Sequence, residues 1–501
     1  MSNIRVTYSG LISLAIRFLS LFTGLAFTLI VTRQLSEEEF GTWGLISGII
    51  IYATIINPII NYWSTREIAR GQESGKTAFV SNGIFSAGGM FVYIIIAFFV
   101  GLQSDAKLEI LMLASILIPV LFINDSLNAI NTGWKPHVVS YGFFTFELIK
   151  IPAGLVLVYF LHLGVEGAIY AVFLGYLASI GIQIFFGKEK LRGDFNVKYI
   201  KKWIRLFWLP VYRGIPGIIG LSDIVIFSII TGTVVGVAYF TAAKTVGYFV
   251  NYTRSFTTGL YPKLLESGKT EYLQETIIHL LYFAFPLIAL SISIARPALF
   301  VLNPIYEIAS PVVIILSIRA LITTLNMTFF EALQGIEKVD IKETSTFRDY
   351  IKSKLMLFPS FQLVRHGVYV GGLVLLLLFI DYNEGNQIEI IIYWALVGLI
   401  VEIPLFIYIL NLVRKNFVLK LEKLTLLKYL IASITSFGFM YILMEKYLVY
   451  ENKLFEFLPN LFIFIIIGIG GYLAITYVID NRTKILIKSI INEIARKYSK
   501  K

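Results

Sequence analysis

The sequence predicts an all-α polytopic membrane protein of about 14 transmembrane helices, with two parallel-repeat six-helix lobes around a central cavity and two peripheral helices. Composition is the first reason. Of the 501 residues, 57% are hydrophobic and 15% are charged, whereas a soluble domain carries about 25% charged residues. Apolar runs of about 20 residues recur along the chain, and each is long enough to cross roughly 30 Å of hydrocarbon. The third reason is an internal repeat, described below.

The first predicted span holds Arg17 and lacks a small-residue cleavage site, so we expect a retained helix and not a signal peptide. Prolines within the spans, such as Pro58 and Pro152, are expected to bend them, because proline lacks the N–H of the helical ladder. The spans are predicted near residues 10–31, 41–62, 82–102, 108–130, 138–161, 164–187, 206–230, 234–253, 276–302, 308–333, 357–380, 388–411, 425–444 and 457–479.

The basic residues predict the orientation of these spans. With the N-terminus inside, 32 of the 43 lysines and arginines fall in inside segments, five in outside loops and six within spans. Such an excess marks the cytoplasmic side. We therefore expect a multi-pass protein of the cell membrane with both termini cytoplasmic. The same placement accounts for the net charge of +11 without nucleic acid.

Motifs of the first half recur in the second half in the same order. Asn124 and Asn326 are 202 residues apart, and two neighbouring pairs share that offset. A segment ending in Lys150 (Phe-Glu-Leu-Ile-Lys) resembles one ending in Arg365 (Phe-Gln-Leu-Val-Arg). Because both halves start inside, the repeats are parallel, which is typical of transporters with a central site. The predicted divisions are 1–195 for the first lobe, 196–415 for the second, and 416–501 for two peripheral helices and a basic cytoplasmic tail.

Six cations lie within the predicted spans, although each costs roughly 2.5–3.5 kcal/mol at a helix centre. A wet cavity that receives an anionic, phosphate-bearing substrate would explain them. Arg365 is the strongest candidate because Gln362 replaces the acid that stands three residues before Lys150. Glu147 neutralising Lys150, snorkelling to the headgroups and structural pairing remain open alternatives. The six are Arg17, Lys150, Arg213, Lys244, Arg319 and Arg365.

Acids and amides within the spans form a second candidate set. Asp223, Glu331, Glu402 and Glu147 are expected either to couple an ion or to balance the cations. The asparagines are expected either to bind sugar or to join helices by hydrogen bonds; they are Asn57, Asn61, Asn124 and Asn326. The chain has no cysteine, and its four histidines show no ligand spacing, so we expect no metal site, no cofactor and no catalytic residue.

Several motifs together resemble the polysaccharide flippases of the Wzx type, which belong to the superfamily that also holds lipid II flippases and multidrug and toxin extruders. They are Thr32-Arg33-Gln34-Leu35-Ser36, Phe40-Gly41-Thr42-Trp43-Gly44, Asn57-Pro58, Arg66-Glu67-Ile68-Ala69, Gly164-Val165-Glu166-Gly167-Ala168 and the 236–244 segment. The resemblance covers essentially the whole chain. It implies two six-helix lobes and movement of a polyprenyl-linked sugar to the outer leaflet. Arg17 stands where the extruder branch typically relies on membrane acids, which weakens that branch.

The favoured function is therefore a flippase or exporter of a polyprenyl-(pyro)phosphate-linked oligosaccharide that works by alternating access. A small-molecule exporter of the same fold remains open. A membrane glycosyltransferase or polymerase is a further alternative, for which Glu37-Glu38-Glu39 in the first outside loop is the only acidic run. The expected partners are the lipid-linked substrate, membrane lipids and glycan-assembly enzymes, and we expect a monomer that is not an enzyme.

Overall fold

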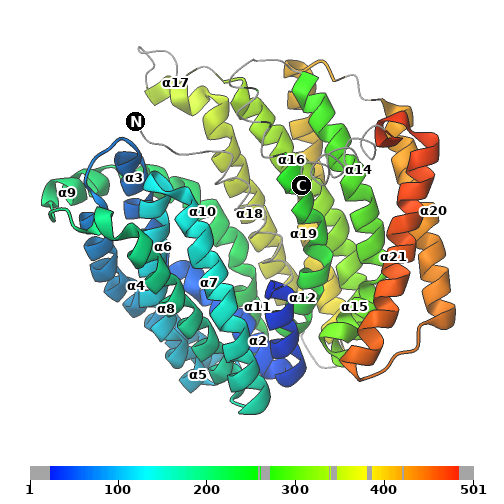
Figure 1. Cartoon of the computed structure of the whole chain (residues 1–501), viewed down its shortest axis with the longest axis horizontal. Helices are drawn as coiled ribbons and strands as arrows, with labels where there is room; N and C mark the ends of the chain where they lie inside the picture. The colour runs from blue at the N-terminus through cyan, green and yellow to red at the C-terminus, as the bar shows by residue number, and fades with distance from the viewer. Residues whose placement is uncertain are drawn as a thin grey trace, which may run out of the picture. The chain divides into compact units, whose positions relative to one another are not determined.

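The computed structural model describes residues 23–257, 260, 264, 271–337, 339, 347–380, 386–419 and 422–484, and the elements in these ranges are helical (Figure 1). The chain divides into two compact units. The first holds residues 1–241 and 362–387, and the second holds residues 242–361 and 388–501. The predicted divisions at residues 195 and 415 are repeat boundaries, which compactness does not test, so they remain a prediction.

The first unit is built from a helix over residues 23–34 and the helices that follow it. Its labelled elements are α2 (Glu37–Ala53), α3 (Asn57–Ala69), α4 (Gly75–Gln103), α5 (Leu108–Leu113), η1 (Ala114–Ile116), α6 (Leu117–Trp134), α7 (Pro136–Gly154), η2 (Leu155–Phe160), α8 (Gly164–Leu191), α9 (Val197–Arg205), α10 (Trp208–Leu221), α11 (Asp223–Thr231), the start of α12 (Val235–Gly247) and most of α18 (Lys354–Phe379).

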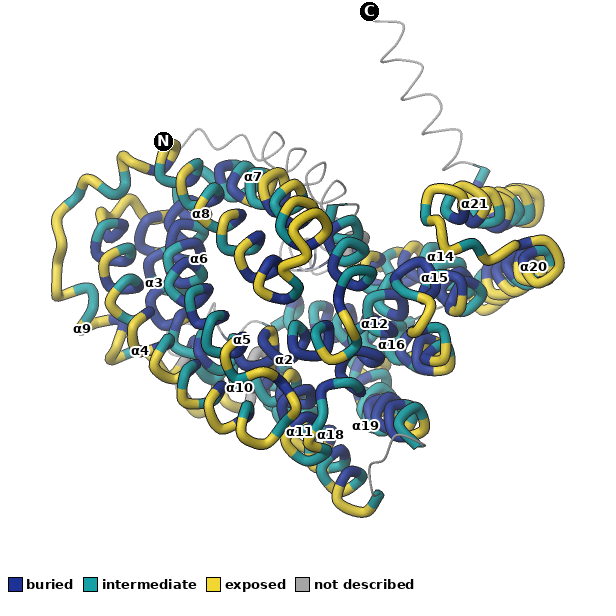
Figure 2. Tube along the Cα trace, turned by 90° about the horizontal axis from the view of Figure 1, so that it is seen from below, coloured by how far each residue is buried: buried dark blue, intermediate teal, exposed yellow. Residues whose placement is uncertain are grey.

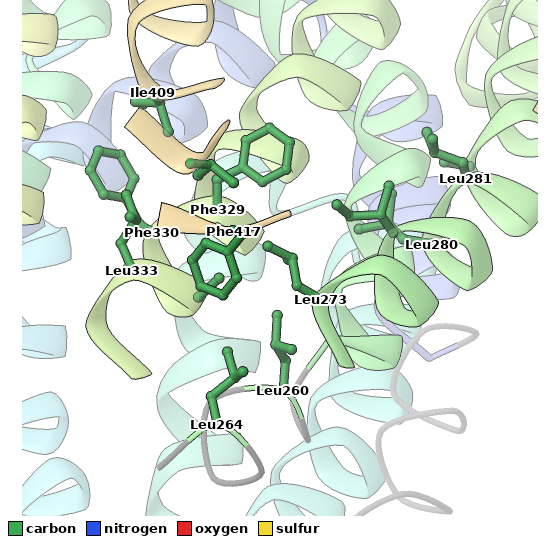
Figure 3. Close-up of a cluster of buried hydrophobic side chains, with 14 of the residues drawn as sticks. Leu260, Leu264, Leu273, Leu280, Leu281, Phe329, Phe330, Leu333, Ile409 and Phe417 are labelled. Carbon is green, nitrogen blue, oxygen red and sulfur yellow. The ribbon is translucent and has the colours of Figure 1, made fainter. Parts of the chain in front are cut away.

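The second unit contains the end of α12 and the remaining elements. These are η3 (Tyr248–Phe256), α14 (Glu271–Ser293), α15 (Ala295–Leu302), η4 (Pro304–Ala309), α16 (Ser310–Gly335), α17 (Phe347–Lys352), α19 (Gln387–Asn416), α20 (Lys423–Tyr447) and α21 (Leu454–Ile479). Large apolar side chains from α14, α16 and α19 form its core, including Leu280, Phe330 and Ile409, each at most 1% exposed (Figure 3). Close packing of these side chains against one another stabilises the bundle through dispersion contacts.

The predicted spans coincide with helices wherever the structure describes them, but their number is not fourteen by length. Within the described residues, 11 helices are long and apolar enough to cross a membrane, or 12 when the bent α2–α3 pair is one span. The first predicted span lies partly outside the described residues. The predicted span at 234–253 is divided between the short α12 and η3. The multi-pass helical class is confirmed, and the count of fourteen stays a prediction.

Prolines mark two of the irregular helices. α2 and α3 meet at an angle of 63°, and Pro58 lies in the first turn of α3, where its missing N–H costs no helical hydrogen bond. Pro152 lies within α7, shortly before the π-helical η2. The bend between α2 and α3 follows from the fixed backbone geometry of proline, whereas α7 continues through Pro152.

The last two helices pack side by side and against α14 in the second unit. The Tyr472 hydroxyl of α21 donates to the Tyr282 carbonyl at 2.6 Å, and the Ser293 hydroxyl donates to the Phe437 carbonyl of α20 at 3.2 Å. Their other faces are exposed (Figure 2). The exposed residues include large apolar ones such as Phe455. An apolar surface of this kind is suited to lipid.

The predicted topology can be measured directly, because the chain has no cysteine. Gln103 and Lys198 are both exposed, so a single cysteine at either position is reachable by a thiol reagent. We expect Gln103→Cys to label from the outside of intact cells and Lys198→Cys only after permeabilisation. The reverse pattern would contradict cytoplasmic termini.

Candidate functional site

A polar face on α18 meets the junction between α10 and α11 in the first unit. Tyr369 donates its hydroxyl hydrogen to Asp223 Oδ2 at 2.7 Å, and both residues are buried. Asp223 begins α11, where its Oδ1 accepts from the Ile224 N–H at 2.9 Å. Carboxylates are favoured at helix N-termini because the exposed N–H groups carry partial positive charge. The junction thus holds an acid inside an apolar span.

Arg365 lies one helical turn before Tyr369, on the same face of α18. Its Nη2 atom is 2.6 Å from His366 Nε2. The His366 ring packs on Gly220 of α10, since a Cβ at Gly220 would lie 2.1 Å from His366 Nδ1. Arginine carries only donors, so His366 Nε2 is the acceptor of this bond. α18 therefore presents an arginine, a histidine and a tyrosine to one polar region.

A second buried acid lies between α16 and α19 in the second unit. Glu402 accepts hydrogen bonds from Thr323 Oγ1 at 3.1 Å and from Asn326 Nδ2 at 3.2 Å. Arg319 stands one turn before Thr323, and its guanidinium packs on Gly398, one turn before Glu402. The contact is close, because a Cβ at position 398 would lie 2.2 Å from Arg319 Nη1 unless the arginine side chain moved. The α16–α19 interface brings a cation, an amide and a carboxylate together.

Lys150 is held differently from Arg365. Its Nζ lies 2.9 Å from Glu147 Oε1, and the two side chains are 10% and 8% exposed. The ammonium also lies 5.0 Å from the centre of the Phe27 ring and 4.7 Å from that of Phe146. A buried pair of this kind balances both charges within one helix. Lys150 and Arg365 share a sequence pattern but have different surroundings, so their equivalence as phosphate ligands is not supported.

The asparagines predicted for sugar binding join helices in this structure. Asn57 donates to Asp125 Oδ2 at 2.7 Å, Asn61 donates to Asn57 Oδ1 at 2.8 Å, and Asn82 donates to Asn61 Oδ1 at 2.9 Å. These three hydrogen bonds connect α3, α4 and α6. Such bonds hold helices together where no water competes for them.

Asn124 belongs to a separate network between α6 and α8. Its Oδ1 accepts from Ser179 Oγ at 2.8 Å and from Gln183 Nε2 at 3.0 Å. With Asn326 bonded to Glu402, all four predicted asparagines make interhelical contacts. Helix packing is the alternative that the sequence left open, and it describes their present role.

The remaining predicted residues are placed as follows. Arg17 lies outside the described residues. Arg213 is on α10, and its side chain is not described. Lys244 of α12 stands 5.6 Å from the Tyr248 ring centre. Glu331, near the end of α16, lies 3.4 Å from Arg254 of η3 and balances that cation.

The acidic run Glu37-Glu38-Glu39 forms the first turn of α2 and takes part in its N-terminal cap. The Glu39 N–H donates to Ser36 Oγ at 3.2 Å, and the Ser36 N–H donates to Glu39 Oε2 at 3.1 Å. This reciprocal pair is a capping box, which stabilises the first turn of a helix. Glu39 therefore has a structural role at the start of α2, in the acidic run on which the glycosyltransferase alternative depended.

Asp105 forms a clasp at the same end of the first unit, which the sequence did not indicate. Its Oδ2 accepts from Thr233 Oγ1 at 2.6 Å and its Oδ1 from the Val234 N–H at 2.8 Å, while its own N–H donates to the Gly232 carbonyl at 2.9 Å. Gly41 of α2 adjoins this turn, because a Cβ there would lie 2.1 Å from the Val234 carbonyl oxygen. The α4–α5 and α11–α12 turns are thereby fastened together.

His366 and Tyr369 are further polar residues that the sequence reading missed. Their signal was available: Gln362, Arg365, His366 and Tyr369 recur at helical spacing within an otherwise apolar segment. No group of three or more histidine, aspartate and glutamate side chains suited to a metal ion occurs in the described part of the chain.

Comparison with solved structures identifies the fold. The chain is similar to the lipid II flippase MurJ in an inward closed conformation, with a TM-score of 0.67 and 14% identity over 94% of this chain and 98% of that one. It is also similar to a multidrug resistance MATE family transporter of the MOP superfamily. The inward-facing form gives a TM-score of 0.58 at 15% identity over 81% of this chain and 98% of that one. The outward-facing form gives 0.51 at 16% identity over 82% and 95%.

No protein-family model matches the chain, and no curated protein sequence matches it. The likeness therefore rests on structure. It confirms the helical membrane fold that the sequence motifs implied.

Proposed function

We propose that the protein is a flippase that moves a polyprenyl-(pyro)phosphate-linked oligosaccharide from the cytoplasmic to the outer leaflet. The observation that carries the proposal is Arg365 on the polar face of a membrane-spanning helix, in a chain with the fold of a lipid flippase. An arginine is costly in hydrocarbon, and a phosphate-bearing substrate supplies the anion that justifies its retention. Its planar guanidinium binds phosphate oxygens through two parallel hydrogen bonds.

Two further cations have supporting roles in this proposal. Arg319 packs on Gly398 in the second unit, one turn before the hydrogen-bonded Glu402, and is the second candidate for phosphate binding. Lys150 is paired with Glu147, so it contributes only when that pair opens. Several moderate contacts suit a flippase better than one tight site, since the substrate has to leave. The lipid tail stays in the bilayer while the two predicted halves alternate access to the two sides.

The extent of the structural likeness supports a lipid substrate over a small molecule. The lipid II flippase covers 94% of this chain, whereas the inward-facing MATE transporter covers 81%. A small-molecule exporter remains the second candidate because the buried acids Asp223 and Glu402 are suited to ion coupling. The proposed location is the cell membrane, with the protein acting as a monomer beside glycan-assembly enzymes.

Purified protein in vesicles tests the proposal against its alternative. A polyprenyl-pyrophosphate oligosaccharide is placed in the leaflet facing one compartment, and its arrival on the other side is followed with a membrane-impermeant glycosidase. We expect the protein to expose the glycan and to leave a cationic dye in the same vesicles untransported. Dye efflux without glycan translocation would instead support the small-molecule exporter.

A further inference from the structure

α9 is a short helix that packs beside α3 (Figure 1). One buried acid joins the two helices. Glu67 of α3 accepts from Trp203 Nε1 at 3.1 Å and from Lys202 Nζ at 2.8 Å. Trp203 is fully buried and stacks on Tyr199 with ring centres 5.8 Å apart. The face of α9 that carries Tyr199 and Trp203 is therefore occupied by the protein, and the helix is held in one orientation.

The next face of α9 exposes apolar side chains. Val197 and Ile204, two turns apart, are 50% and 48% exposed, and Phe207 and Trp208 just after the helix are 48% and 44% exposed. α9 connects two spans, since α8 ends at Leu191 and the following span runs over 210–231. The connection between two spans lies at a membrane surface, so these side chains stand where headgroups meet hydrocarbon. An apolar stripe at that depth is typical of interfacial helices.

A basic face adjoins the apolar stripe. Lys198, Lys201 and Arg205 are exposed, follow one another at helical spacing and have no acidic residue beside them within α9. Lys202 alone of the four cations is engaged with Glu67. Cations beside a membrane-embedded apolar stripe attract acidic phospholipids, at about 1 kcal/mol or fivefold each.

We propose that α9 is a binding surface for acidic phospholipid headgroups. Each of its three faces contacts different surroundings. Trp203 and Lys202 pack on the protein, and Val197 and Ile204 enter the membrane interface. The remaining cations bind lipid phosphate. The arrangement anchors the connection between α8 and α10 at one membrane surface. This surface is separate from the proposed glycan site and does not depend on it.

The test compares two variants of the full-length protein in nanodiscs that contain phosphatidylcholine with a minor fraction of phosphatidylglycerol. The first variant combines Lys198→Gln, Lys201→Gln and Arg205→Gln, none of which touches Glu67. The matched control combines Lys188→Gln, Arg414→Gln and Lys415→Gln, which removes three exposed cations from the ends of α8 and α19. Mass spectrometry of the lipids that remain bound after mild delipidation gives the ratio of phosphatidylglycerol to phosphatidylcholine.

We expect the wild type and the control to retain phosphatidylglycerol preferentially. In the α9 variant, the ratio of bound phosphatidylglycerol to phosphatidylcholine should be at least tenfold lower. Melting in pure phosphatidylcholine nanodiscs checks that the α9 variant is folded. Equal loss in the control variant would overturn the proposal, because net charge and not α9 would then attract the lipid. A wild-type protein with no preference for phosphatidylglycerol would also overturn the proposal.

Discussion

Arg365→Ala is expected to abolish glycan translocation while the protein stays folded and inserted. Arg365 lies on the face of α18 that also carries the buried Gln362 and Tyr369. A charge-assisted contact to phosphate contributes roughly 1.5–3 kcal/mol, so its loss weakens substrate binding about 10- to 150-fold. Arg365→Lys keeps the charge but loses the two-pronged geometry, and partial activity is expected.

Gln362→Glu refines the same prediction. It places an acid three residues before the cation, as Glu147 stands before Lys150, whose Nζ is 2.9 Å from the acid. A paired arginine is less available to phosphate, so we expect weakened transport without loss of folding. Arg414→Ala at the exposed end of α19 is the matched control and should transport normally.

The measurement is glycan accessible to glycosidase in vesicles with equal amounts of inserted protein. Full activity in Arg365→Ala would remove this residue from the mechanism. Equal loss in the alanine and lysine variants, with normal substrate binding, would assign Arg365 to a conformational step.

The spans were predictable because the thickness of the hydrocarbon layer sets the length of an apolar segment that crosses it. The positions at which these spans break into separate helices were harder to predict. Pro58 lies at the bend between α2 and α3, and Pro297 lies in the first turn of α15, four residues after α14 ends at Ser293. However, Pro404 lies within the continuous α19, so proline alone does not locate the breaks. α9 lies between the predicted spans 164–187 and 206–230, where nine residues with four cations have too little apolar length to predict a membrane helix. Its structure depends on Glu67, which is far away in the sequence.

Contacts within one helix were readable, and contacts between helices were not. The spacing of Glu147 and Lys150 already indicated a pair, since residues three apart on a helix are neighbours. The bond between Tyr369 and Asp223 joins residues 146 positions apart. Periodicity identifies a polar face, but it does not tell which helix that face meets. The same limit hid the roles of the asparagines, whose partners are on other helices.

The second prediction concerns Asp105, which lies between α4 and α5 and fastens the α11–α12 turn with both carboxylate oxygens. These turns belong to different predicted repeats, and the basic residues place both on the outer side. We expect Asp105→Ala to release the turn and to favour opening at that end. The bonds are partly exposed, so losing them destabilises the closed turn by about 1–2 kcal/mol. This energy changes the opening equilibrium by a factor of about 5–30.

Val234→Cys reports the opening in this cysteine-free chain, because Val234 is 0% exposed and contributes only its backbone N–H to the clasp. Labelling by a membrane-impermeant maleimide should rise about 5- to 30-fold when Asp105→Ala is added. Asp105→Asn keeps the shape and one carbonyl acceptor, so an intermediate rate is expected. Glu109→Ala removes a nearby exposed acid on α5 and serves as the control.

Glycan translocation should fall in Asp105→Ala, since a transporter that stays open at one end completes fewer cycles. Unchanged labelling with unchanged transport would show that the clasp only shapes the turn.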